Sequence, residues 1–365
     1  MIRDDACRLD GVCAAWGHGR LRSWMPLAAT GFSGASLYVV SFADVPGRFV
    51  LKPFAANVPR QRAEWVHQLM HHARHAGVTE VPQLLTTAAG GSVGESEDGG
   101  LWELVEFVEG QPCASPTSAQ AAAALVAVAR VHGAVASWPG AVPDHGPSRG
   151  VVRRMEQARN LLGRSWATRL EAADSRDGTA ELAQEVRALC RDADRILAGP
   201  LGRRSLTAVA EAGIGAVHRQ AVLRDIWSDH VLFDPMAPAR VAGIVDFHAA
   251  GIDTPLADLA RLLGSWEIEV PLGLAVVPSL ADRWAEPLAA YEQASGRSLA
   301  AADRWLCGWL SASAVICSLD NWFRWILEEN RHFADASRVL ARIRRLLVDL
   351  PAAVEWLSHA AKLPV

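Results

Sequence analysis

The sequence predicts an α+β protein of two lobes, a small β-rich N-lobe over residues 1–109 and a larger helical C-lobe over residues 110–365. Three observations predict it. The first hundred or so residues alternate β-branched runs with turn residues. Beyond Gly110, long stretches repeat apolar residues at i, i+3 and i+4, as helices do. An irregular polar insert, residues 221–250, interrupts the helical part, and 365 residues are enough for two cores.

The N-lobe is predicted to hold a sheet with one helix. Four runs rich in β-branched residues predict strands, at residues 36–42, 48–52, 82–87 and 101–108. Between the second and third runs, residues 59–77 predict a helix whose last turn is rich in His and Arg and which ends at a glycine. The glycine-rich tract at residues 90–100 is too short for a linker, and we expect a hairpin loop there.

The C-lobe is predicted to be mainly helical. Apolar periodicity predicts helices over residues 119–136, 153–170 and 180–197, and again from residue 255 onward. Residues 199–215 are predicted to break the helical pattern. Four tryptophans near the end have helical spacing, which favours core packing, although one or two could stack on a sugar ring: Trp305, Trp309, Trp322 and Trp325.

Composition excludes several classes of function. The net charge of −4 leaves no basic field to hold a polyanion, so we expect no nucleic-acid partner. The N-terminus carries charges where a signal peptide needs an apolar stretch, and apolar runs such as residues 121–129 are about half a membrane span. We expect a cytoplasmic protein with no membrane partner. Six scattered cysteines without metal-ligand spacing fit a reducing compartment: Cys7, Cys13, Cys113, Cys190, Cys307 and Cys317.

A glycine-containing loop precedes the first predicted strand. Gly31 and Gly34 would let backbone amides approach a phosphate, and the Ser33 hydroxyl could add a donor. A tight hairpin explains the same spacing, which matches neither a Walker A motif nor a dinucleotide-binding fingerprint. The loop supports a phosphate-binding site only in combination with other residues.

Lys52 ends the second predicted strand, and Glu64 follows on the predicted helix. A strand lysine held by a helix glutamate is how protein kinases direct an ammonium group at the α- and β-phosphates of ATP. A lysine on a solvated strand face is the simpler alternative. The same helix carries a histidine cluster whose i, i+4 spacing could bind a metal, but we interpret it as a basic last turn favoured by the helix dipole: His67, His71, His72 and His75.

Two acids frame the polar insert. Asp225 lies in a loop, His230 follows five residues later, and a short apolar strand returns to Asp246. Phosphoryl transfer needs a carboxylate to orient the attacking hydroxyl and accept its proton, and ligands for the metal that neutralises the phosphates. A hairpin would bring both acids to one cleft. Two aspartates capping turns would explain either acid alone, but not both together with Lys52 and Glu64.

Taken in order, these residues resemble the aminoglycoside phosphotransferase and choline-kinase-like family, which shares the protein-kinase-like fold. That family has a catalytic loop H-G-D-x-x-x-x-N and a later I-D-[FW], and residues 223–233 and 244–247 fall on those positions. Residues 253–260 resemble its D-P-x-x-D-L-A segment, whose last acid, here Asp258, is structural. Residues 102–110 resemble its hinge, where backbone groups take the adenine.

The resemblance implies ATP and Mg²⁺ as cofactors and a role for each site residue. It makes Asp225 the catalytic base and Asp246 a metal ligand, with Lys52 and Glu64 as the phosphate-positioning pair. It also implies that the nucleotide is held by the remaining candidates: Gly31, Ser33, Gly34, Glu106 and Val108.

Two positions depart from the family pattern. Leu223 replaces a loop histidine that is mostly structural in the family. His230 replaces the asparagine that binds the metal through an amide oxygen. Mg²⁺ prefers oxygen ligands, whereas imidazole suits Mn²⁺ or Zn²⁺ better. Either His230 contacts the metal, or Asp229 or water takes over, or one metal site is lost. The Asp-His loop marks a variant branch of the family.

The predicted reaction is transfer of the ATP γ-phosphate to a hydroxyl of a small molecule, of the aminoglycoside, sugar or amino-alcohol type. One alternative is a pseudokinase that binds nucleotide without transfer, against which Lys52, Asp225 and Asp246 argue. The other is a protein kinase, which the missing Ala-Pro-Glu signature after Asp246 disfavours.

Overall fold

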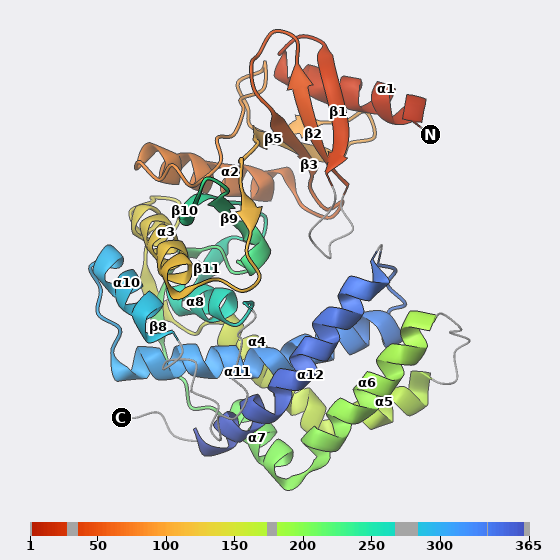
Figure 1. Ribbon diagram of the computed structural model, residues 1–365, viewed down its shortest axis with the longest axis vertical. Helices are drawn as coiled ribbons and strands as arrows, with labels where there is room; N and C mark the ends of the chain where they lie inside the picture. The colour runs from red at the N-terminus through yellow and green to blue at the C-terminus, as the bar shows by residue number, and fades with distance from the viewer. Residues whose placement is uncertain (1, 28–35, 174–180, 267–283, 334, 361–365) are drawn as a thin grey trace. The chain divides into compact units, whose positions relative to one another are not determined.

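The computed structural model describes residues 2–27, 36–173, 181–266, 284–333 and 335–360 (Figure 1). The chain falls into two compact units. Unit 1 comprises Met1–Pro143, Gln220–Ile252 and Glu286–Arg297, and unit 2 comprises Asp144–Arg219, Asp253–Ala285 and Ser298–Val365. The polar insert of the sequence thus belongs to the same unit as the N-terminal strands. The lobe boundary near residue 109 stays a prediction.

Unit 1 begins with an antiparallel five-stranded sheet of order β1-β2-β3-β5-β4. Its strands are β1 (Leu21–Leu27), β2 (Leu37–Phe42), β3 (Phe49–Pro53), β4 (Gly94–Glu95) and β5 (Leu101–Glu106). The predictions of β2, β3 and β5 are confirmed, and so is the hairpin between β4 and β5. The strand predicted at residues 82–87 is wrong: only Leu84 forms a bridge, to Val105. Pro82 lacks an N–H, and the Gln83 N–H donates to the Glu106 side chain instead of continuing a ladder.

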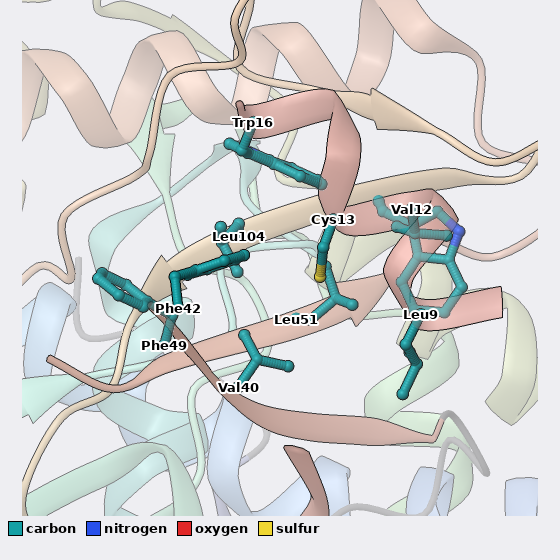
Figure 2. Close-up of a cluster of buried hydrophobic side chains, with 10 residues drawn as sticks. Leu9, Val12, Cys13, Trp16, Val40, Phe42, Phe49, Leu51 and Leu104 are labelled. Carbon is teal, nitrogen blue, oxygen red and sulfur yellow. The ribbon is translucent and has the colours of Figure 1, made fainter. Parts of the chain in front are cut away.

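Helix α1 (Ile2–Cys13) and the short helix η1 (Ala14–Trp16) supply four of the ten buried residues that form the core of this sheet (Figure 2). The α1 segment was not predicted as a helix, because its inward side is a narrow stripe around Leu9 and Val12 in an otherwise polar stretch. Trp16 is buried and donates from Nε1 to the Leu85 carbonyl at 3.0 Å. A Cβ at Gly94 would lie 2.4 Å from the Trp16 ring, so the close approach of β4 requires glycine. Ten buried residues form this cluster: Leu9, Val12, Cys13, Trp16, Val40, Phe42, Phe49, Leu51, Trp102 and Leu104.

Helices α2 (Arg60–His75) and α3 (Ser118–Ala136) confirm two predicted helices. Thr117 caps α3 in a capping box with Gln120. Among the described helices, α3 alone is long and apolar enough to cross a membrane, and 56% of that window is buried inside the protein, as in a core helix. The buried His132 of α3 contacts the Tyr291 hydroxyl of α10 (Ala285–Ser295) at 2.9 Å.

A second sheet in unit 1 carries the polar insert. Its order is β10-β9-β6, with β6 (Gln111–Pro112), β9 (Val231–Asp234) and β10 (Ala237–Ile244). The 3₁₀ helix η2 (Ser228–His230) leads directly into β9. Since β10 ends two residues before Asp246, the β9–β10 hairpin returns the chain from His230 to Asp246, as the sequence predicts.

Unit 2 is mainly helical. Its elements are α4 (Arg149–Gly163), α5 (Trp166–Ala173), α6 (Glu181–Ala198), α7 (Pro200–Ala210), α8 (Pro255–Leu263), α11 (Ala301–Phe323), the π-helical η3 (Arg324–Glu328) and α12 (Ala336–His359). The helix predicted over 153–170 is in fact two, α4 and α5. The break predicted at 199–215 is wrong over Pro200–Ala210, which form α7 with Pro200 in the first turn, where a missing N–H costs nothing; residues 211–215 lie outside any helix, as predicted. Strand β7 (Asp144–Gly146) pairs with the start of β8 (Val217–Val222), and β11 (Gly251–Asp253) precedes α8.

A buried carboxylate joins three helices of unit 2. Asp320 of α11 accepts hydrogen bonds from Trp166 Nε1 at 3.0 Å and Arg169 Nη1 at 2.6 Å on α5. It also accepts one from Gln157 of α4 at 3.3 Å. Trp309 and Trp322 are buried, whereas Trp305 and Trp325 are half-buried, so core packing accounts for the first two.

Candidate active site

Lys52 and Asp246 meet in unit 1 although 194 residues separate them. Lys52 Nζ donates to Asp246 Oδ1 at 2.7 Å, and the two side chains are 14% and 40% exposed. Lys52 lies near the end of β3, and Asp246 follows β10. The two sheets of unit 1 therefore bring a cation and a carboxylate predicted to serve the same site into direct contact.

Two residues of the polar insert adopt left-handed backbone conformations. Arg224, directly before Asp225, has φ 66°, and Asp246 also has φ 66°. This conformation costs a non-glycine residue about 1–2 kcal/mol. Such residues persist where the surrounding structure holds them, and they cluster at functional sites. Of the two acids singled out in the insert, Asp246 itself has this backbone conformation, whereas for Asp225 it is the preceding residue, Arg224, that has it.

His230 is oriented by a backbone hydrogen bond. Its Nδ1–H donates to the Asp225 carbonyl at 3.0 Å, and its Nε2 lies 3.7 Å from Asp246 Oδ2. In the neutral imidazole, a proton on Nδ1 leaves the lone pair on Nε2, the nitrogen that faces Asp246. An imidazole nitrogen and a carboxylate oxygen together fit a divalent cation. In the described parts of the chain, no group of three or more His, Cys, Asp or Glu side chains is placed so that it could hold a metal ion.

The charges around Asp246 favour its anion. Burial raises the pKa of this carboxyl, but the charges of Lys52 and His230 and the hydrogen bond from Lys52 more than offset that effect. The pKa of Asp246 therefore lies below its usual value, and the group is ionised at neutral pH.

Asp225 lies in the loop between β8 and η2 and is half-buried. Its Oδ1 accepts a hydrogen bond from Trp227 Nε1 at 2.8 Å, which fixes the direction of the carboxylate. Asp229, the other acid of the loop, is also half-buried. The Asp225 backbone carbonyl accepts the His230 hydrogen bond, so the candidate base and the candidate metal ligand are linked directly.

Glu64 of α2 is not paired with Lys52 in this structure. The partner of Lys52 is Asp246, and no ion pair or hydrogen bond between Lys52 and Glu64 occurs within the described residues. Directly opposite Lys52 in the β3–β5 register lies Glu103, which sequence reasoning missed. Antiparallel register could have revealed it, because residues that face each other share one side of a sheet.

The hinge residues follow β5. The Glu106 N–H donates to the Gln83 carbonyl at 2.8 Å, so it is already used. The Val108 N–H has no acceptor among the described residues. A Cβ at Gly243 would lie 2.8 Å from Val108, so β10 approaches the hinge closely only because that residue is glycine. Of the two hinge residues, Val108 has the backbone donor that a ligand could use.

Gly31, Ser33 and Gly34 lie outside the described residues. Asp258 is fully buried in the first turn of α8. Near it in sequence, Asp253 accepts a hydrogen bond from Ser148 Oγ at 2.5 Å and another from the Gly150 N–H at 2.9 Å. Both acids belong to unit 2, where burial of Asp258 and the hydrogen bonds of Asp253 are those of structural residues.

Comparison with known families gives one match that covers most of the chain. The model of the phosphotransferase enzyme family, APH, matches residues 29–309. A search of the curated proteins found no match to the sequence.

Several solved structures resemble the chain over nearly its whole length. The spectinomycin phosphotransferase APH(9)-Ia, in complex with ADP and spectinomycin, is 10% identical with a TM-score of 0.66, covering 94% of this chain and 96% of that one. A microcompartment-associated aminopropanol kinase is 16% identical with a TM-score of 0.59 and 99% coverage of both chains. The amicoumacin kinase hAmiN, with AMP-PNP and Ca²⁺, is 13% identical with a TM-score of 0.55 and 96% coverage of both. At these identities the likeness shows the fold, and the predicted α+β, protein-kinase-like fold is confirmed.

Proposed function

Because the chain belongs to the phosphotransferase enzyme family, we propose that it transfers the γ-phosphate of ATP to a hydroxyl of a small molecule. The proposed acceptor is of the aminoglycoside, sugar or amino-alcohol type. The structural relatives include a spectinomycin phosphotransferase and an aminopropanol kinase, which supports a small-molecule acceptor. Complexes of such relatives with ADP and AMP-PNP support a nucleotide donor.

The observation that carries the proposal is the contact between Lys52 and Asp246, with His230 on the other carboxylate oxygen of Asp246. A lysine ammonium that faces the phosphates stabilises the charge that builds up during transfer. Asp246 and His230 would hold a divalent cation, which when bound neutralises the phosphate oxygens. The Asp-His donor set favours Mg²⁺ or Mn²⁺ according to how far His230 takes part.

Asp225 is the proposed catalytic base. In the reaction the acceptor oxygen forms its bond to the γ-phosphorus as the bond between that phosphorus and the β,γ-bridging oxygen breaks, and the hydroxyl proton passes to the Asp225 carboxylate. The hydrogen bond from Trp227 would hold that carboxylate in one orientation.

The remaining assignments complete the nucleotide site. We propose that the backbone of Glu106 and Val108 takes the adenine, and that Gly31, Ser33 and Gly34 cover the phosphates. Glu64 remains the partner of Lys52 that the resemblance implies for the nucleotide-bound state. We further propose a lobe boundary near residue 109 and a cytoplasmic location.

The test is an acceptor screen with the purified protein, ATP and either Mg²⁺ or Mn²⁺. Alcohols, amino alcohols, sugars and aminoglycosides are offered in turn, and ADP release and the phosphorylated product are measured together. We expect product formation with at least one acceptor, and none when ATP is omitted. Nucleotide binding without any phosphorylated product across the panel would favour the binding-module alternative.

A further inference from the structure

A buried polar cluster lies on the face of the five-stranded sheet that carries Lys52. Its centre is Glu103 of β5, which is 5% exposed and faces Lys52 across the β3–β5 ladder. None of the roles proposed above uses this carboxylate. A buried anion is costly unless other groups compensate its charge, and the compensating groups here come from two distant segments.

Two histidines hold Glu103. His67 of α2 has its Nε2 2.9 Å from Glu103 Oε2, and its Nδ1 lies 2.8 Å from Ser92 Oγ. His248 has its Nε2 2.9 Å from Glu103 Oε1. Burial raises the pKa of Glu103, but the charge of His248, the side-chain contacts of His248 and His67, and the charge of Lys52 together hold it well below its usual value. Glu103 is therefore an anion at neutral pH.

The His248 contact fixes the segment that follows Asp246. His248 lies two residues after Asp246, and its ring stacks on Phe54 with centroids 4.1 Å apart. From α2, Arg62 donates to the His248 carbonyl at 3.2 Å and to the Ala250 carbonyl. The left-handed backbone of Asp246 needs such support from its surroundings. The segment after Asp246 is thus held in place from two sides, by Glu103 of strand β5 and by Arg62 of helix α2.

The arrangement differs from a helix glutamate that holds the strand lysine. In this structure the anion next to Lys52 in the sheet is Glu103, and α2 reaches it through His67. Glu64, on the same helix, has no ion pair within the described residues. Helix α2 is therefore connected to Lys52 and Asp246 indirectly, by way of Glu103 and the segment after Asp246.

We propose that Glu103 is a positioning residue for phosphoryl transfer: through His248 it orients the segment that presents Asp246, and through His67 it ties that segment to α2. Its catalytic consequence rests on the proposed function, whereas its effect on metal-dependent nucleotide binding does not. Mutation of outer-shell groups that orient a metal ligand typically changes metal affinity by about 10–100-fold.

The test compares Glu103→Gln, His248→Gln and the double variant with wild type. Glu95→Gln is the matched control, because Glu95 is an acid of the same sheet that also pairs with α2, through Arg60, but is exposed. Calorimetry measures ADP affinity with Mn²⁺ and with a chelator, and steady-state kinetics measure kcat and KM. We expect Glu103→Gln to reduce the gain in ADP affinity on adding Mn²⁺ by about tenfold or more and to lower kcat. The ADP affinity measured in the presence of the chelator should stay unchanged. Glu95→Gln should match wild type.

The double variant separates positioning from general loss of stability. If Glu103 acts through His248, the loss in the double variant is smaller than the product of the two single losses. Multiplicative losses overturn the proposal, as does a folded Glu103→Gln protein with wild-type metal dependence. A loss confined to a parallel Glu64→Gln variant also overturns it. Where Glu103→Gln does not fold, His248→Gln decides, and normal metal dependence there overturns the inference.

The binding measurement also separates this inference from the proposed function. A wild-type protein that binds ADP with metal but phosphorylates no acceptor refutes the proposed function. Calorimetry on the variants then still tests whether Glu103 affects metal-dependent ADP binding. A wild-type protein that binds no ADP under either condition refutes both.

Discussion

Asp225 and Asp246 are both aspartates of the polar insert, but their neighbours differ. Asp246 is paired with Lys52, whereas Asp225 accepts a hydrogen bond from Trp227. Asp225→Asn should keep that hydrogen bond, because an amide oxygen replaces the carboxylate oxygen. It should leave nucleotide affinity nearly unchanged and lower turnover by about 10²–10⁴-fold, as the loss of a general base does.

Turnover with an identified acceptor and nucleotide affinity, measured on the same preparation, check this prediction. Asp229→Asn, in the same loop, is the control and should retain most of the turnover. Wild-type turnover in Asp225→Asn would remove Asp225 from the role of base.

Lys52→Ala should weaken ATP binding or slow transfer, because it removes the cation proposed to face the phosphates. It also leaves Asp246 without the partner that lies 2.7 Å away. A thermal-shift titration with ATP and metal measures the effect. Arg60→Ala, which removes a cation from an exposed ion pair with Glu95, should shift like wild type. An unchanged ATP-induced shift in Lys52→Ala would exclude Lys52 from the nucleotide site.

His230→Asn should retain activity and move the metal preference toward Mg²⁺. An amide oxygen is a harder donor than the imidazole nitrogen that faces Asp246. Mg²⁺ and Mn²⁺ titrations of ATP turnover, in wild type and variant, measure the preference. Superimposable metal profiles would mean that the His230 side chain does not touch the ion and serves only to donate to the Asp225 carbonyl.

At the scale of elements, Asp320 joins α11 to α4 and α5 through a buried network in unit 2. Asp320→Ala would leave the Arg169 guanidinium, 16% exposed, without this partner. Breaking one side of a buried ion pair costs about 3–5 kcal/mol of the free energy of unfolding. Asp192→Ala breaks an exposed pair with Arg195 instead and should cost less than about 1 kcal/mol. Urea unfolding of both variants compares the two, and equal losses would contradict the network's role.

The elements differ in how well the sequence predicts them, for physical reasons. β2, β3, β5, α2 and α3 have visible apolar periodicity and were predicted. Helix α7 lies within residues 199–215, where the sequence analysis predicts a break; its Pro200 stands in the first turn, where proline is favoured. β1 was missed because most of its residues are exposed or half-buried.

The candidate site was predicted in part. Motif spacing placed Lys52 and Asp246 in one site, and the structure brings them together. Glu103 was missed because its place opposite Lys52 depends on the pairing of β3 with β5 across some fifty residues. Family spacing cannot reveal a residue that acts only through the register of a sheet.

At the scale of the whole molecule, the cysteines report on its packing. Burial raises the pKa of Cys13, Cys307 and Cys317 to about 12 and also raises the pKa of Cys190. Cys113 is half-exposed. Iodoacetamide at about pH 8 should modify Cys113 in the native protein and spare Cys13, Cys190, Cys307 and Cys317, because the thiolate is the reactive form.

Peptide mapping by mass spectrometry measures the modification of each cysteine, and unfolding in urea should make all of them react. Rapid labelling of Cys307 or Cys317 in the native state would contradict the packing of α11.

The pairing of Lys52 with Asp246 means that each group satisfies the other's charge before any ligand arrives. ATP alone would bring polyphosphate toward a carboxylate, and a metal ion alone would meet an ammonium group already attached to its ligand. Each ligand therefore separates the pair at less cost when the other is present, and by reciprocity each raises the affinity for the other by the same factor. On the proposed function, the protein should therefore bind the metal–nucleotide complex strongly and either component supplied singly only weakly.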